Sequence, residues 1–216
     1  VTGTNDAPDI TVGTDDAAAA DLTETNAGLT TSGTLSVADF DESDTVAPSV
    51  VGVSVSGNDG GIGNASLEAM LSVTPGDAID ATSTAGSINW TFDSGTEAFD
   101  HLAVGETLTL TYTVRATDSP AGASDDQTVS ITITGTNDVP TADVLPDQSD
   151  RDGDAVSFDA SVAFGDLDPS DTLTFSATGL PPGLAIDSAT GMISGTLTGD
   201  ASQSTPFSIL VTADDG

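Results

Sequence analysis

The sequence predicts an all-β protein made of two tandem β-sandwich domains, the second of which lacks its last strand. Three observations lead to this prediction: apolar residues alternate with Thr or Ser, clusters of Gly, Asp, Asn and Pro separate the alternating runs, and one set of short motifs occurs twice in the same order. The 216 residues are enough for two sandwich domains of about 100 residues each.

The clearest strand lies at residues 107–115, where Leu108, Leu110, Tyr112 and Val114 alternate with Thr. A period of two is typical of a strand with one buried face. In the first domain the pattern predicts seven strands, at 9–13, 29–37, 49–56, 66–73, 87–92, 106–116 and 126–134, with a hint of a short helix at 66–71. In the second domain it predicts strands at 155–159, 172–177, 184–187, 191–196 and 206–213. Seven short antiparallel strands predict an immunoglobulin-like or cadherin-like sandwich.

The internal repeat sets the domain boundary. Val-Thr-Gly-Thr-Asn-Asp-Ala-Pro at 1–8 is answered by Ile-Thr-Gly-Thr-Asn-Asp-Val-Pro at 133–140. Asp-Phe-Asp-Glu-Ser-Asp-Thr at 39–45 is answered by Asp-Leu-Asp-Pro-Ser-Asp-Thr at 166–172, and a weaker pair joins 114–118 to 211–214. Repeated order indicates tandem units of one architecture. We therefore expect domains at 1–138 and 139–216.

The charge is strongly one-sided. The chain has 35 Asp and Glu against two Lys and Arg, a formal net charge of -33. That balance argues against nucleic acid and against an anionic membrane surface as partners. The regular apolar alternation argues against a disordered acidic chain. Self-repulsion of so many carboxylates predicts that a hard divalent cation, Ca²⁺, neutralises them.

Strand parity gathers the acidic residues. If the strands run alternately up and down, the N-terminal linker and the loops after the second and sixth strands meet at one end of the first domain. These segments carry Asn5, Asp6, Asp39, Asp41, Asp44 and Asp118. The opposite end carries Asp21, Glu24, Asp93, Glu97 and Asp100. This second end is expected to meet linker residues Asn137 and Asp138 and the Asp166, Asp168, Asp171 and Asp214 of the second domain.

We take Glu24 and the residues of the two linker-associated clusters as candidate calcium ligands. Calcium takes about 6–8 oxygen ligands, often carboxylates and Asn carbonyls. Without the cation, such clusters repel themselves. The hypothesis is therefore a chain that is stiff with calcium and looser without it, and whose folding calcium supports.

Two long motifs carry family resemblances. Residues 101–118, His-Leu-Ala-Val-Gly-Glu-Thr-Leu-Thr-Leu-Thr-Tyr-Thr-Val-Arg-Ala-Thr-Asp, and residues 127–140 resemble the VCBS repeats of bacterial RTX-type adhesins. Residues 177–196, Ala-Thr-Gly-Leu-Pro-Pro-Gly-Leu-Ala-Ile-Asp-Ser-Ala-Thr-Gly-Met-Ile-Ser-Gly-Thr, preceded by Phe-Gly-Asp-Leu-Asp, resemble bacterial cadherin-like domains akin to those of dystroglycan.

These resemblances imply a large secreted protein of the bacterial cell surface, exported by type I secretion, that serves in adhesion and biofilm formation. They also imply calcium between domains and neighbouring repeats of the same polypeptide as partners. The Thr-Asn-Asp-x-Pro linker looks like a shortened cadherin calcium linker without the further Asp before it and the Asn after it. That departure implies a weaker site, or one completed by water.

Other motifs favour structural roles. Residues 57–64 look like one RTX nonapeptide, but a single copy is more typical of a turn. Asp150 to Asp154 resembles an EF-hand loop, yet position 12 is Ser161 instead of Glu, so a polar turn is the better interpretation. His101 is the only His and there is no Cys, which argues against a transition-metal site and against a Ser-His-Asp triad. Trp90 is expected in the core.

The sequence leaves three functions open. The first is a calcium-rigidified extender or adhesion segment, without enzymatic activity. The second is a module of the same adhesin that binds carbohydrate, peptide or another cell-surface ligand through the second domain, either on loop 178–184 or on calcium itself. The third is an accessory module of a secreted polysaccharide-degrading enzyme. The expected missing strand adds a hypothesis: an open sheet edge in the second domain takes a strand from elsewhere.

Overall fold

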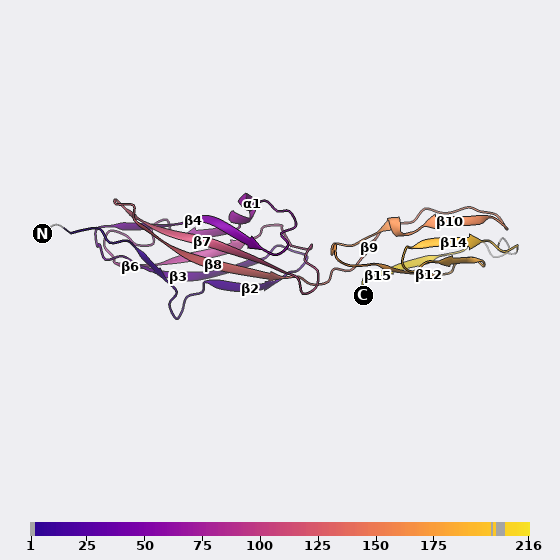
Figure 1. Ribbon diagram of the computed structural model, residues 1–216, viewed down its shortest axis with the longest axis horizontal. Coiled ribbons are helices and arrows are strands. Elements are labelled where there is room, and N and C mark those ends of the chain that lie inside the picture. The colour runs from indigo at the N-terminus through magenta and orange to yellow at the C-terminus, as the bar shows by residue number, and fades with distance from the viewer. Residues whose placement is uncertain (1–2, 200, 202–205) are drawn as a thin grey trace. The chain divides into compact units, whose positions relative to one another are not determined.

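The computed structural model describes residues 3–199, 201 and 206–216. The chain forms two compact units, Val1–Thr136 (unit 1) and Asn137–Gly216 (unit 2), and nearly all of the regular secondary structure in each is strand (Figure 1). The predicted all-β fold class is confirmed.

Unit 1 is a sandwich of two four-stranded sheets. The first sheet has the order β1 (Asp9–Thr11), β3 (Thr30–Ala38), β6 (Ala85–Asp93) and β5 (Leu71–Thr74), all antiparallel. The second has the order β2 (Ala19–Thr23), β8 (Ser124–Thr134), β7 (Thr107–Ser119) and β4 (Thr45–Ser56). In this second sheet β2 runs parallel to β8, and the other pairs are antiparallel.

The core of unit 1 lies between these sheets because alternate residues of the long strands point inward. Leu108, Leu110, Tyr112 and Val114 of β7 are fully buried, as the period of two predicts. Trp90 is also fully buried, and its Nε1 donates a 2.6 Å hydrogen bond to the carbonyl oxygen of Ala17. Its indole packs over Gly33, where an added Cβ would lie 2.5 Å from the ring. The prediction of Trp90 as a core residue is confirmed.

Two predictions for unit 1 were wrong in detail. Strand β2 was not predicted, since its Ala-rich segment lacks the β-branched and aromatic residues typical of strands. The predicted strand at 66–73 divides into a short helix, α1 (Asn64–Glu68), and β5. Leu67 of α1 is buried against the core and its carbonyl accepts a 2.8 Å hydrogen bond from the Tyr112 hydroxyl, so tertiary packing fixes this helical turn.

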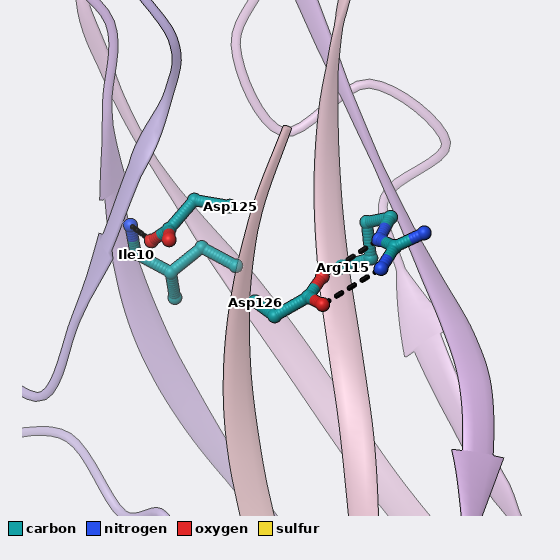
Figure 2. Close-up of polar contacts among 4 residues, drawn as sticks. All are labelled: Ile10, Arg115, Asp125 and Asp126. Carbon is teal, nitrogen blue, oxygen red and sulfur yellow. Dashed lines mark hydrogen bonds and ion pairs between the residues drawn. The ribbon is translucent and has the colours of Figure 1, made fainter. Parts of the chain in front are cut away.

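The start of β8 is tied to two neighbours (Figure 2). Asp126 receives two 2.7 Å hydrogen bonds from the guanidinium of Arg115, its register partner on β7, and this pairing lowers the pKa of Asp126. The adjacent Asp125 accepts a 2.9 Å hydrogen bond from the backbone N–H of Ile10 in β1. Because β1 and β8 belong to different sheets, Asp125 joins the two sheets at the end where the N-terminal linker enters.

The sheets of unit 2 have fewer strands. One has the order β10 (Ala155–Asp159), β14 (Met192–Thr196) and β13 (Leu184–Ile186), and a second pairs β12 (Thr174–Thr178) with β15 (Leu210–Asp214). Two-residue strands β9 (Thr141–Ala142) and β11 (Phe164–Gly165) also pair, with the 3₁₀ turn η1 (Ser161–Ala163) before β11. Its buried apolar residues among those described are Ala160, Phe175, Ile193, Leu197 and Ala201.

The two motifs that resemble calcium loops form turns. In the loop after β4, Asn58 and Asp59 accept hydrogen bonds from the N–H groups of Gly60 and Gly61, each two residues ahead. In the loop before β10, Asp154 accepts from the N–H of Arg151 and returns a backbone hydrogen bond to the Arg151 carbonyl. Within the described residues, no helix has the length and apolar character needed to span a bilayer.

Candidate functional site

The N-terminal pole of unit 1 brings together three segments distant in sequence. It consists of Asn5, Asp6, Asp39, Asp41, Asp44 and Asp118. Asn5 and Asp6 come from the N-terminal linker, Asp39 to Asp44 from the loop between β3 and β4, and Asp118 from the end of β7. Strand β3 runs antiparallel to β1, so the end of β3 lies beside the start of β1, where the linker enters. Strand β7 runs antiparallel to β4, so the end of β7 lies beside the start of β4, where the loop from β3 ends.

Direct hydrogen bonds connect these segments. The side-chain amide of Asn5 donates to Oδ2 of Asp118 at 2.7 Å, and the backbone N–H of Asp6 donates to Oδ2 of Asp41 at 2.7 Å. Within the loop, the N–H of Asp41 donates to Oδ1 of Asp39 at 3.0 Å. The N–H of Asp44 donates to the carbonyl oxygen of Asp41 at 3.0 Å. The linker is therefore held to the loop and strand before any cation is considered.

Burial makes this pole electrostatically unusual. Asp39, Asp44 and Asp118 are at most 6% exposed. Oδ2 of Asp39 is buried and has no hydrogen-bond partner. Burying a carboxylate oxygen without a donor is costly. An oxygen in this condition, surrounded by other carboxylates, is suited to accept a cation.

The N-terminal pole of unit 2 repeats this arrangement almost bond for bond. It consists of Asn137, Asp138, Asp166, Asp168, Asp171 and Asp215. The amide of Asn137 donates to Oδ2 of Asp215 at 2.9 Å, and the N–H of Asp138 donates to Oδ2 of Asp168 at 2.7 Å. The N–H of Asp168 donates to Oδ1 of Asp166 at 3.0 Å. The N–H of Asp171 donates to the Asp168 carbonyl at 3.1 Å.

Asp168 is the most constrained carboxyl of this second pole. It is 1% exposed, and burial, followed by the charges of Asp171, Asp138 and Asp166, raises its pKa. Its Oδ1 and the Oδ2 of Asp166 are buried without a hydrogen-bond partner. A bound cation would reverse this penalty, since an opposite charge favours the ionised carboxylate.

One residue of the second pole was not among the candidate ligands. Asp215 takes the place of Asp118, whereas the predicted Asp214 is exposed and accepts a hydrogen bond from the N–H of Gly216. Strand period contains the signal: Val114, Ala116 and Asp118 of β7 lie two residues apart, as do Val211, Ala213 and Asp215. Residues 114–118 match 211–214, with Asp118 on Asp214, only if one residue is skipped.

Glu24 lies at the opposite end of unit 1, directly after β2. It is 1% exposed; its Oε2 accepts hydrogen bonds from the N–H and hydroxyl of Thr136, at 2.9 and 2.7 Å. Its Oε1 is buried without a partner, and a carboxylate oxygen of Asp100 lies within 4.8 Å of a Glu24 oxygen. Of the other acidic residues expected there, Asp93 accepts a hydrogen bond from the N–H of Gly95 and Glu97 accepts one from the N–H of Phe99, whereas Asp21 is exposed in β2.

The donor chemistry of these clusters fits Ca²⁺. Every side chain of these clusters that could bind a metal is a carboxylate or an Asn amide, and both offer hard oxygen ligands. Sulfur is absent from the chain's ligand set because it has no Cys, and the single His, His101, has its Nε2 3.2 Å from the Asn58 carbonyl in a distant loop. In unit 1, Asp39, Asp41 and Asp118 would hold the cation, and in unit 2, Asp166, Asp168 and Asp215 would do so.

Comparison with known protein families finds one match, and it lies in the second unit. A family model described as "Putative Ig domain" matches residues 138–216. This match agrees with the sandwich topology of unit 2 and supports an immunoglobulin-like or cadherin-like fold there. No curated protein matches the chain.

Several solved structures are similar to this chain. One shows domains EC3-6 of protocadherin gammaB7, at 15% identity over 97% of this chain and 47% of that chain, with a TM-score of 0.48. Mouse cadherin-23 EC22-24 is similar at 17% identity over 97% of this chain and 59% of that chain, with a TM-score of 0.47. The chain therefore spans about half the length of these cadherin structures.

Proposed function

We propose that this chain is a calcium-rigidified extender or adhesion segment of a large secreted protein of the bacterial cell surface, without catalytic activity. Ca²⁺ binds the N-terminal pole of each unit and makes the connection between successive units stiff. The partners at these poles are neighbouring repeats of the same polypeptide, and the VCBS and RTX-adhesin resemblance supports this placement. The chain acts by holding more distant binding domains at reach.

The observation that carries this proposal is the repetition of one oxygen array. In both poles the side-chain amide of the linker Asn donates a hydrogen bond to an Asp at or just after the end of a strand. The backbone N–H of the linker Asp donates to the second Asp of an Asp-x-Asp motif, and the N–H of that second Asp donates to the first. In both, a carboxylate oxygen is buried without a donor. Two poles with the same surplus of buried negative oxygen support a shared ligand with positive charge.

The physical role of the cation follows from the charge. Three or more carboxylates in each pole repel one another, and the chain offers only two Arg and no Lys to offset them. Ca²⁺ supplies the positive charge and coordinates the oxygens that lack donors. Because each pole draws its ligands from a linker and from two other segments, the bound ion restrains the linker relative to the unit that follows it.

The glycines of loop 178–184, the segment considered as a ligand-binding loop, have a structural explanation. Gly179 and Gly183 adopt φ values of +78° and +98°. A Cβ on Gly179 would lie 2.2 Å from the Ser208 carbonyl, and one on Gly183 would lie 2.1 Å from the Thr196 carbonyl. These glycines therefore permit close backbone packing, which accounts for their pattern without a carbohydrate, a peptide or the substrate of a polysaccharide-degrading enzyme.

The first test is calorimetric titration of the full chain with Ca²⁺ after chelation. We expect at least one binding event per unit, with Asp39→Asn weakening only the event in unit 1 and Asp168→Asn only that in unit 2. Asp15→Asn serves as the matched control, because it removes the same charge from an exposed turn outside both poles. Equal effects of all three variants would show that calcium responds to net charge alone and would contradict the proposal.

Stiffness is a separate measurement. Small-angle scattering with Ca²⁺ should give a single extended particle, and chelation should broaden the distance distribution. If calcium binds with the expected variant pattern but scattering does not change, the poles are calcium sites and the extender role is wrong.

A further inference from the structure

The linker that enters unit 1 is held at two points by one hairpin, the turn that joins β7 to β8. Near the end of β7, Oδ2 of Asp118 accepts the 2.7 Å hydrogen bond from the side-chain amide of Asn5. At the start of β8, Oδ2 of Asp125 accepts the 2.9 Å bond from the backbone N–H of Ile10 (Figure 2). Asn5 and Ile10 lie on either side of Asp6, a candidate calcium ligand of the linker.

The hairpin fixes both carboxylates by itself. The N–H of Ala123 donates to Oδ1 of Asp118 at 2.8 Å, and the N–H of Asp118 donates to the Ala123 carbonyl at 2.9 Å, which closes the turn. Asp125 is the register partner of Ala116, which is fully buried. Because register partners share one face of a sheet, as do residues two apart on a strand, Asp118 and Asp125 both point toward the interior.

Strand β1 needs the contact with Asp125. It has three residues and lies at the edge of its sheet, where it pairs with β3. The N–H of Ile10 points away from β3, so Ile10 and Val37 form a non-hydrogen-bonded pair. Ile10 is 5% exposed, and a buried N–H without an acceptor is costly. Asp125 therefore fixes the place where the linker leaves the pole and enters the sandwich.

The next residue of β8 has the same charge and a different contact. Asp126 is exposed on the outer face of the sheet and pairs with the guanidinium of Arg115 (Figure 2). Two adjacent aspartates therefore differ in what they hold: Asp125 holds β1, and Asp126 holds a side chain of β7. This difference makes Asp126 a matched reference for Asp125.

We propose that Asp125 is a positioning residue for the calcium site of unit 1. Through the N–H of Ile10 it keeps the linker in place, so that Asn5 and Asp6 already lie at the pole when the ion binds. Ligand groups held in this way raise the affinity, because their conformational entropy is not lost on binding. The inference rests on the proposed function, since it concerns the calcium site that this function requires.

The first test compares two substitutions that remove the same charge. Asp125→Asn keeps an oxygen that can accept from the N–H of Ile10, whereas Asp125→Ala does not. In titration calorimetry of the full chain, the calcium affinity of unit 1 should fall about fivefold with Asp125→Ala and less than about twofold with Asp125→Asn. Calcium binding to unit 2 is the internal reference and should not change.

Asp126→Ala is the matched control for this titration. It should change the calcium affinity of unit 1 by less than about twofold, because the linker keeps its acceptor. A loss as large as that of Asp125→Ala would show that the affinity follows charge near the pole, and would overturn the proposal. The fluorescence of Trp90, which lies in the core of unit 1, shows whether each variant is folded.

Amide exchange measured by nuclear magnetic resonance tests the contact without calcium. In the calcium-free wild type, the amide of Ile10 should exchange slowly and that of Thr4, in the exposed linker, freely. Free exchange at Ile10 would overturn the proposal, and this measurement needs no variant. In Asp125→Ala the amides of Ile10 and Asp6 should exchange faster, and saturating calcium should restore the protection of Asp6. Failure to restore it would show that Asp125 only maintains the fold, and would also overturn the proposal.

The outcomes separate this inference from the proposed function. If unit 1 of the wild type binds no calcium, the proposed function is wrong and the inference fails with it. If the wild type binds calcium and Asp125→Ala binds it as tightly as Asp125→Asn does, the calcium site stands and the positioning role of Asp125 is wrong.

Discussion

Units 1 and 2 have the same pole and different bodies. The oxygen arrays at their N-terminal ends agree in the segments that supply the residues and in which atoms pair. Their sandwiches differ: unit 1 has two four-stranded sheets around a large buried core, whereas the described part of unit 2 has one sheet of three strands, two sheets of two strands and fewer buried apolar residues. Local acidic motifs thus reproduce one oxygen array on sandwiches of unequal size, and we expect the sandwich with the smaller core to depend more on its ligands.

The largest effect should come from the core of unit 1. Trp90→Ala removes a fully buried indole and its hydrogen bond to Ala17, and should lower the free energy of unfolding of unit 1 by about 3–5 kcal/mol. Phe175→Ala in unit 2 is the matched comparison. Differential scanning calorimetry with Ca²⁺ should show each variant shifting a different transition. A shift of both transitions by either variant would mean that the units unfold together.

Calcium removal should affect unit 2 more than unit 1. At about 100 times its Kd, calcium adds about 2.7 kcal/mol to the unit it binds. The same free energy moves the melting temperature further in a smaller domain, because the unfolding entropy scales with size. The fluorescence of Trp90, the only Trp, reports unit 1, and calorimetry reports both units. Equal shifts in the melting temperatures of the two units would indicate that the smaller sandwich of unit 2 does not make it more dependent on calcium.

Asp214 and Asp215 allow a test of which residue of unit 2 corresponds to Asp118 of unit 1. The repeat in the sequence matches Asp118 with Asp214, whereas the hydrogen bonds of the structure match it with Asp215. Asp215→Asn should weaken calcium binding to unit 2 about tenfold, or about 1.4 kcal/mol, since Asp215 occupies the position of Asp118. Asp214→Asn, at an exposed neighbouring side chain of equal charge, should leave the affinity nearly unchanged. Titration calorimetry measures both affinities. A larger loss with Asp214→Asn would show that Asp214, and not Asp215, corresponds to Asp118.

The smallest effect concerns the crossing from β1 to β2 in unit 1, a connection made by residues 12–18. Asp16 accepts hydrogen bonds from the N–H groups of Gly13 and Ser36 and from the Thr34 hydroxyl. The Gly13 bond first, and then those from Ser36 and Thr34, lower the pKa of Asp16. Asp16→Asn should therefore cost unit 1 about 1 kcal/mol at neutral pH.

The pH dependence of that effect has a definite sign. Since the folded pKa of Asp16 is below the ordinary value of 3.8, its contribution is fully present above pH 3.8 and is lost as pH falls through the folded pKa. Urea unfolding of wild type and Asp16→Asn, with Ca²⁺ absent, should converge in acid. Asp15→Asn is again the control, and a difference that persists in acid would assign the effect to packing.

The sequence by itself determined much of this protein. Alternation in residues 107–115 and 126–134 sufficed to predict β7 and β8, because a period of two is a local property of a half-buried strand. The repeated Asn-Asp and Asp-x-Asp motifs sufficed to predict acidic poles, because strand parity decides at which end each loop lies. The same parity, applied to Val211 and Ala213, contains the information that Asp215 continues the inner face.

Tertiary structure decided the rest. Strand β2 has weak local preference and exists because β8 pairs with it in parallel. The turn of α1 is fixed by the bond between Leu67 and Tyr112, residues 45 positions apart. Which carboxylate oxygens are buried without a donor, as in Asp39 and Asp168, depends on how linker, loop and strand pack together. Short-range periodicity determines the elements, whereas burial and unmet hydrogen bonds arise only from contacts between distant segments.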